Sequence, residues 1–235
     1  MKKWLALTLA IIMVLSVVAC DTDKSRDERK PEKDKIEENK TEENKTEENK
    51  TEENKTEEKV EISRGKIKGD VYTNEFLGIE FTKPDSWVYA TDEEIAETIN
   101  VGVDWLLGEQ FKEALENNPL VYDMMVVDQR TGSSVNVVYE NLSKTLSTNI
   151  TVEQYVEALK EQVAGVSTWT VNFSNTLEKA KLGNTEFTKF SFIVTVQGVS
   201  MKQVYYLKKI DGYMCFIVIC ITRGHTIEQI EAMFK

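Results

Sequence analysis

Four perfect copies of the pentapeptide Glu-Glu-Asn-Lys-Thr follow one another at residues 37–56, and this repeat strongly limits how the chain can fold. A helix would gain from opposite charges four positions apart, but Glu38 meets Glu42 at that spacing. A five-residue period keeps no apolar stripe on one helix face, and asparagine and threonine are weak helix formers. The wider segment 21–61 contains only two aliphatic residues and no aromatic residue. We therefore expect a disordered tether that spans about 35 Å.

The first nineteen residues have the organisation of an export signal. Two lysines precede an apolar run over residues 4–18, which is short for a membrane-spanning helix. The run ends in Val17-Val18-Ala19-Cys20, which resembles the bacterial lipobox. The resemblance implies that a diacylglyceryl group is attached to Cys20 and that the chain is cleaved between Ala19 and Cys20. An ordinary secretory signal and an uncleaved anchor are the alternatives, but the abrupt polar sequence after Cys20 fits lipidation better.

Lipidation of Cys20 would hold the chain on the extracytoplasmic face of the cell membrane, with membrane lipid as its partner. Two acyl chains give stable anchoring, because each buried methylene contributes about 0.8 kcal/mol. The sequence thus divides into a lipoprotein signal peptide (1–19), the lipidated cysteine with its tether (20–64) and one globular domain (65–235).

Charge excludes one class of partner. The chain has a formal net charge of −11, whereas nucleic-acid binding requires a concentrated basic surface. Residues 21–61 contain 17 acidic and 11 basic residues, a difference of six, so more than half of the excess lies in the tether. We expect no nucleic-acid partner.

The globular domain contains every aromatic residue except Trp4, as a packed core requires. Its apolar periodicity and turn signals predict short strands and three helical regions. The expected strands cover residues 71–76, 79–82, 87–90, 121–128, 135–141, 168–174, 187–196, 200–209 and 213–222, with a further short strand possible near 176–181. The expected helices run from 91 to about 116, with Gly108 as a candidate break, from 151 to 163, and from 226 onward.

Each expected helix begins with a capping box, in which a threonine and a Glu or Gln three residues later bond to each other's backbone. The pairs are Thr91 with Glu94, Thr151 with Gln154, and Thr226 with Gln229. Strand neighbours joined by tight turns predict an α+β domain, a mostly antiparallel sheet flanked by helices. The segment 214–221 is apolar on both faces and is the best candidate for a central strand.

The opening of the domain suggests a family. Its pattern is Gly-x-x-Tyr-x-Asn-x-x-x-Gly-x-x-Phe-x-x-Pro-x-x-Trp, formed by Gly69, Tyr72, Asn74, Gly78, Phe81, Pro84 and Trp87. This pattern resembles the start of the Mog1/PsbP-like domain, and the resemblance implies a curved antiparallel sheet with helices on both faces, an α/β/α sandwich. Known members are binding or assembly proteins, so no catalytic residues carry over.

Cys215 and Cys220 are five positions apart in one predicted strand, which places them on opposite faces. A disulfide between them would break the strand, so two small buried thiols are the better interpretation.

Few other residues suggest chemistry. The only histidine, His225, precedes a predicted helix and is expected to be a turn residue, and a single histidine without a cysteine cluster makes zinc binding improbable. Acidic residues near Thr91 could bind a cation, but acids that complement a helix dipole are more common. They are Asp92, Glu93, Glu94 and Glu97.

Two further sets remain open. Asp123, Asp128 and Glu140 could form a carboxylate pair for sugar cleavage, with strand-end charges as the alternative. Several aromatic residues could line a ligand groove, but core positions are more common for such side chains. They are Trp87, Trp105, Tyr139 and Trp169.

The sequence therefore favours a membrane-anchored, extracytoplasmic, non-catalytic binding or assembly module, without a cofactor or a bound metal. Its partner would be an unidentified protein or envelope component. An extracytoplasmic hydrolase and a small solute-binding lipoprotein are the alternatives.

Overall fold

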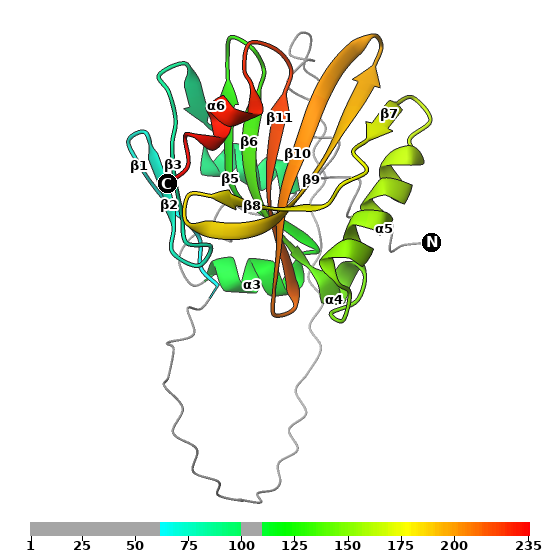
Figure 1. Ribbon diagram of the computed structural model, residues 1–235. Helices are drawn as coiled ribbons and strands as arrows, with labels where there is room; N and C mark the ends of the chain where they lie inside the picture. The colour runs from blue at the N-terminus through cyan, green and yellow to red at the C-terminus, as the bar shows by residue number, and fades with distance from the viewer. Residues whose placement is uncertain (1–61, 100–109) are drawn as a thin grey trace, which may run out of the picture. The chain divides into compact units, whose positions relative to one another are not determined.

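The computed structural model describes residues 62–99 and 110–235, which form the coloured part of Figure 1. Ala19, Cys20, the polar repeat, Trp105 and Gly108 lie outside these residues. Within these two ranges, no helix is both long enough and apolar enough to cross a membrane.

An antiparallel sheet of eight strands forms the main layer of the described domain (Figure 1). Seven strands lie in the order β4-β5-β6-β11-β10-β9-β7. The eighth strand, β8, also pairs with β9, at residues 185–189, whereas β7 pairs with residues 192–195. The strands are β4 (Trp87–Tyr89), β5 (Leu120–Asp128), β6 (Ser134–Asn141), β7 (Thr170–Phe173), β8 (Glu178–Leu182), β9 (Thr185–Val196), β10 (Val199–Ile210) and β11 (Tyr213–Ile221).

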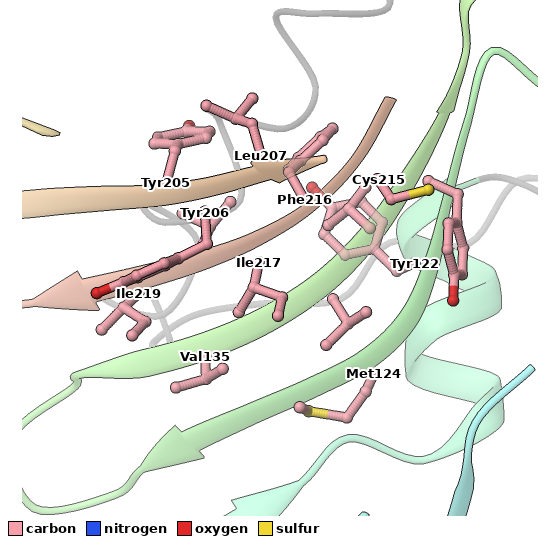
Figure 2. Packing of buried hydrophobic residues seen from close by; sticks show 14 of the residues in the cluster. Tyr122, Met124, Val135, Tyr205, Tyr206, Leu207, Cys215, Phe216, Ile217 and Ile219 are labelled. Carbon is pink, nitrogen blue, oxygen red and sulfur yellow. The ribbon is translucent and has the colours of Figure 1, made fainter. Parts of the chain in front are cut away.

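The predicted central strand is confirmed, because β11 is fourth of the seven strands and pairs with β6 and β10. Its side chains alternate between two covered faces, which explains why its sequence is apolar at every position. Figure 2 shows Phe216 pointing to the side of Tyr205, and Ile217 pointing to the side of Tyr206. We call these the α5 face, which carries Phe216, and the α6 face, which carries Ile217.

A small sheet packs on the α6 face. It contains β1 (Lys66–Lys68), β2 (Val71–Asn74) and β3 (Ile79–Thr82) in that order. The predicted hairpin across Gly78 is confirmed, although β2 ends at Asn74, because the Asn74 side chain accepts a hydrogen bond from the Leu77 amide and closes the turn. The C-terminal residues extend this sheet through hydrogen bonds between Lys235 and Glu80. Strand β1 was not predicted, since its three exposed residues carry no apolar pattern.

Five helices occur in the described ranges: α2 (Asp92–Ile99), α3 (Gln110–Asn117), α4 (Leu142–Thr145), α5 (Val152–Ala164) and α6 (Ile227–Glu231). The three predicted capping boxes are all present. Helix α4 was not predicted, because one turn is too short to show periodicity.

Helices cover both faces of the large sheet. The Tyr155 ring of α5 packs on Phe216, whereas Glu231 of α6 accepts a hydrogen bond from Tyr206 on the opposite face. The expected α+β fold, a mostly antiparallel sheet with helices on its faces, is confirmed. The α6 face is covered by the small sheet as well as by a helix.

Candidate functional site

The three carboxylates Asp123, Asp128 and Glu140 are all buried, with at most 1% of each residue exposed. Glu140 lies opposite Leu120 in the sheet, and Asp128 is eight residues farther along β5, which corresponds to about 25 Å of strand. Glu140 bonds to α5 and Asp123 bonds to the small sheet on the other face. The structure therefore does not bring the three carboxylates together as a pair for sugar cleavage, which needs two within about 5–10 Å.

Asp123 is the extra residue of a β-bulge in β5, which turns its side chain toward the small sheet. The Gly65 amide donates to both carboxylate oxygens, at 2.9 Å and 3.0 Å. The Tyr72 hydroxyl and the Asn74 side-chain amide donate to Oδ2, the latter at 2.7 Å, and Asn74 also bonds to Tyr139. Burial raises the pKa of Asp123, and these hydrogen bonds oppose that shift. Asp123 thus joins the two sheets.

The chain enters the fold at two residues that we call the Arg64–Gly65 junction. Arg64 bonds to Asp92 at the start of α2, and its Nε lies 3.9 Å from Oδ1 of Asp123. A Cβ atom at position 65 would lie 2.3 Å from the Tyr72 ring, so only glycine lets the backbone pass this close. The junction is therefore fixed to both a helix and the large sheet.

Asp128 pairs with the only histidine. Nε2 of His225 lies 2.8 Å from Oδ2 of Asp128, and the His225 ring meets Trp87 edge-on with 5.5 Å between ring centroids. The Thr131 hydroxyl and the Arg130 amide also donate to the carboxylate, at 2.9 Å and 3.1 Å. Burial alone would raise the pKa of Asp128, but the donors led by His225 outweigh it and lower the pKa to about 2.

The prediction for His225 was therefore incomplete. It precedes α6 as expected, but its side chain is only 13% exposed and holds the β5–β6 turn. Its partner is 97 positions away, and no local pattern marks a contact of that range.

Glu140 has the fewest partners of the three carboxylates. Oε2 accepts a hydrogen bond from the Tyr155 hydroxyl of α5, and Oε1 has no partner. Burial raises the pKa of Glu140 to about 7, although Tyr155 and nearby Thr145 oppose the shift. Near neutral pH this carboxyl group is therefore partly protonated.

Most of the other candidate residues that the structure describes have structural contacts. Asp92 holds Arg64 and Glu94 completes a capping box, while among the described side chains no three His, Cys, Asp or Glu residues gather as a metal site would require. Trp87 and Tyr139 are buried in the core, and Trp169 packs partly buried against it, whereas Trp105 is outside the described residues.

The cysteines agree with the prediction of two small buried thiols. Cys215 and Cys220 are free and fully buried. Cys215 lies opposite Tyr139, and Cys220 contacts Gln203 on the other face of the sheet. Burial raises the pKa of Cys220 to about 12 and that of Cys215 further.

The comparisons with known proteins leave the family open. No family model matches the chain, so the Mog1/PsbP-like resemblance stays a prediction, and no curated protein matches its sequence. Among solved structures, the chain is similar to LpqN, described as involved in cell envelope biogenesis of Mycobacterium tuberculosis. The two share 10% identity with a TM-score of 0.32, over 60% of this chain and 68% of that chain. A likeness of this size assigns neither a family nor a function.

Proposed function

We propose that this chain is an extracytoplasmic lipoprotein whose domain binds a protein or an envelope component and catalyses no reaction. In this proposal Cys20 carries the lipid and residues 21–61 form the tether. The observation that carries it is the Arg64–Gly65 junction, where the proposed tether meets the domain.

The junction suits a domain that hangs from a flexible chain. A pull on the tether reaches the fold at residues 62–65, where Ile62 packs against the core, and a loosely held first strand would peel away there. Gly65 is bound to Asp123 in β5, and Arg64 is bound to Asp92. A load therefore passes into the large sheet before it reaches β1.

The use of the polar residues favours binding over catalysis. A general base must lie within about 2.6–3.2 Å of the group whose proton it removes. Instead, Asp123 joins two sheets, and Asp128 and His225 hold a turn. These side chains are committed to structure.

The anchor is tested by intact-mass analysis of the mature full chain, together with metabolic labelling by a palmitate analogue. The expected mature protein begins at Cys20 and carries the label, and Cys20→Ser abolishes the labelling. A mature chain that begins at another residue, or an unmodified Cys20, would contradict the proposal.

Binding is tested on intact cells with a membrane-impermeant amine crosslinker. We expect the full chain to crosslink to a protein or wall polymer, and a chain that lacks residues 65–235 but keeps its anchor to lose that product. Equal crosslinking by both chains would mean that the domain is not the binding module. A crosslinked species that the domain turns over chemically would support an enzyme instead.

A further inference from the structure

Glu140 is an ionisable group without a compensating charge. It is 0% exposed on β6, and none of the ion pairs among the described residues includes it. A carboxylate offers about four acceptor positions, yet among the described residues the Tyr155 hydroxyl alone bonds directly to this one, with the Thr145 hydroxyl nearby. Oε1 has no partner. An ionised carboxylate in such a site is strongly disfavoured, whereas the protonated acid is tolerated.

Among the described residues, no cation acts on Glu140 that could replace the proton. Across the sheet it lies opposite Leu120 of β5 and Met214 of β11, both apolar and buried. The Thr145 hydroxyl of α4 is nearby, but it donates to the Asn141 carbonyl oxygen at 3.2 Å. The remaining titratable groups are phenols: Tyr155 of α5, with Tyr122 and Tyr205 near it.

Helix α5 covers this carboxyl group through Tyr155. Tyr155 is 2% exposed and lies in the first turns of α5, where it both bonds to Glu140 and packs on Phe216. Moving α5 away from the sheet would break that hydrogen bond and admit water to the carboxyl group. The position of α5 and the charge on Glu140 are therefore linked.

We propose that Glu140 is a buried proton switch: with its proton bound it holds α5 against the large sheet, and its ionisation loosens α5. The direction follows from the raised pKa of about 7, compared with an ordinary 4.5 when α5 is open and the group is hydrated. Below about pH 4.5 both states are protonated and α5 is held most firmly. Between about pH 4.5 and 7 the open state loses its proton first, so opening becomes easier, and above pH 7 the effect levels off.

Loosening of α5 would uncover an aromatic surface. Below the helix, Lys160 of α5 lies over the Phe190 ring, and Tyr205 stacks with Phe192 and contacts Phe216. Acidic surroundings would keep this surface closed, and neutral surroundings would let it open more often. The switch does not depend on the lipid anchor or on the proposed binding function.

Hydrogen exchange of the full chain tests the proposal. Protection factors of α5 (residues 152–164), corrected for the intrinsic exchange rate, are compared at pH 5 and pH 8. We expect the wild-type α5 protection to fall roughly 70-fold from pH 5 to pH 8, because the pKa of Glu140 is about 7 in the closed state and 4.5 in the open state. Glu140→Gln keeps the shape of the acid but cannot ionise, so its α5 protection should stay constant.

Two variants separate a switch from a merely structural residue. Glu157→Gln changes an exposed glutamate of the same helix and should leave the wild-type response intact. Tyr155→Phe removes the phenol that donates to Glu140 and opposes the rise of its pKa, so the pH at which the α5 response levels off should move higher. The difference between wild type and Glu140→Gln should be confined to α5 and absent from the β2–β3 hairpin.

Either of two results would overturn the proposal: constant α5 protection in the wild type, or an equal pH response in Glu140→Gln. If Glu140→Gln fails to fold, infrared difference spectroscopy of the wild type can measure the protonation of Glu140 instead. A protonated-carboxyl band that disappears near pH 7 supports the switch, and its complete loss by pH 5.5 refutes it.

Discussion

Replacement of Asp123 by alanine should be among the most damaging single changes in the domain. The substitution leaves the half-buried Gly65 amide and the buried Tyr72 hydroxyl without their acceptor. The Asn74 side chain loses one acceptor but keeps Tyr139. An unsatisfied buried donor costs about 1–3 kcal/mol, so we expect the free energy of unfolding to fall by about 3–5 kcal/mol.

Urea unfolding followed by tryptophan fluorescence measures this loss. The matched control is Glu75→Ala, which removes a carboxylate from the same small-sheet region. Its side chain is 79% exposed and lies 3.7 Å from Lys66, itself 79% exposed. An exposed pair of this kind contributes about 0–1 kcal/mol, so the control should unfold at nearly the wild-type urea concentration.

Gly65→Ala tests the same site from the backbone side. Its Cβ would lie 2.3 Å from the Tyr72 ring, so the ring must shift away from Asp123, at a cost of about 1–3 kcal/mol. If Asp123→Ala lowers the free energy of unfolding no more than Glu75→Ala, or if Gly65→Ala is neutral, Asp123 does not join the two sheets.

Three further outcomes follow from the structure. Because the pKa of Asp128 is lowered to about 2, ionised Asp128 should add about 2 kcal/mol to the free energy of unfolding above pH 4, and this contribution should be lost as the pH falls toward 2. In acid-unfolding curves, His225→Ala should make this loss smaller. Cys215 and Cys220 should not react with a thiol reagent until the protein is unfolded, and rapid modification of the native protein would contradict their burial. Gln197 has a φ of 49° in the β9–β10 turn, so Gln197→Gly should raise the free energy of unfolding by about 0.5–1 kcal/mol in urea titrations, whereas a decrease would contradict this geometry.

Local sequence signals predicted the elements whose stabilising contacts are themselves local. The capping boxes at Thr151 and Thr226 close within three residues, and both are present. The placement of β11 at the centre followed from its apolar residues at every position, and the odd spacing of the cysteines placed them on opposite faces.

Elements without such local signals were missed. Strand β1 is three exposed residues long, and it forms because Lys66–Lys68 pairs with β2 after Gly65 is fixed by Asp123. Its stability comes from a contact 58 positions away in the sequence, which neither propensity nor periodicity reports.

The three carboxylates show why the same limit applies more strongly to sites. All lie on two neighbouring strands, and the strand pattern could not rank them. Their protonation is decided by how many donors other segments supply: Asp128 receives His225, a hydroxyl and an amide, and its pKa falls to about 2. Glu140 receives the Tyr155 phenol with the Thr145 hydroxyl nearby, which does not offset its burial, and its pKa rises to about 7. A carboxylate in a buried strand thus acquires its chemistry from residues that pack on the sheet, so a substitution at Tyr155, 15 positions away in the sequence, should change the titration of Glu140.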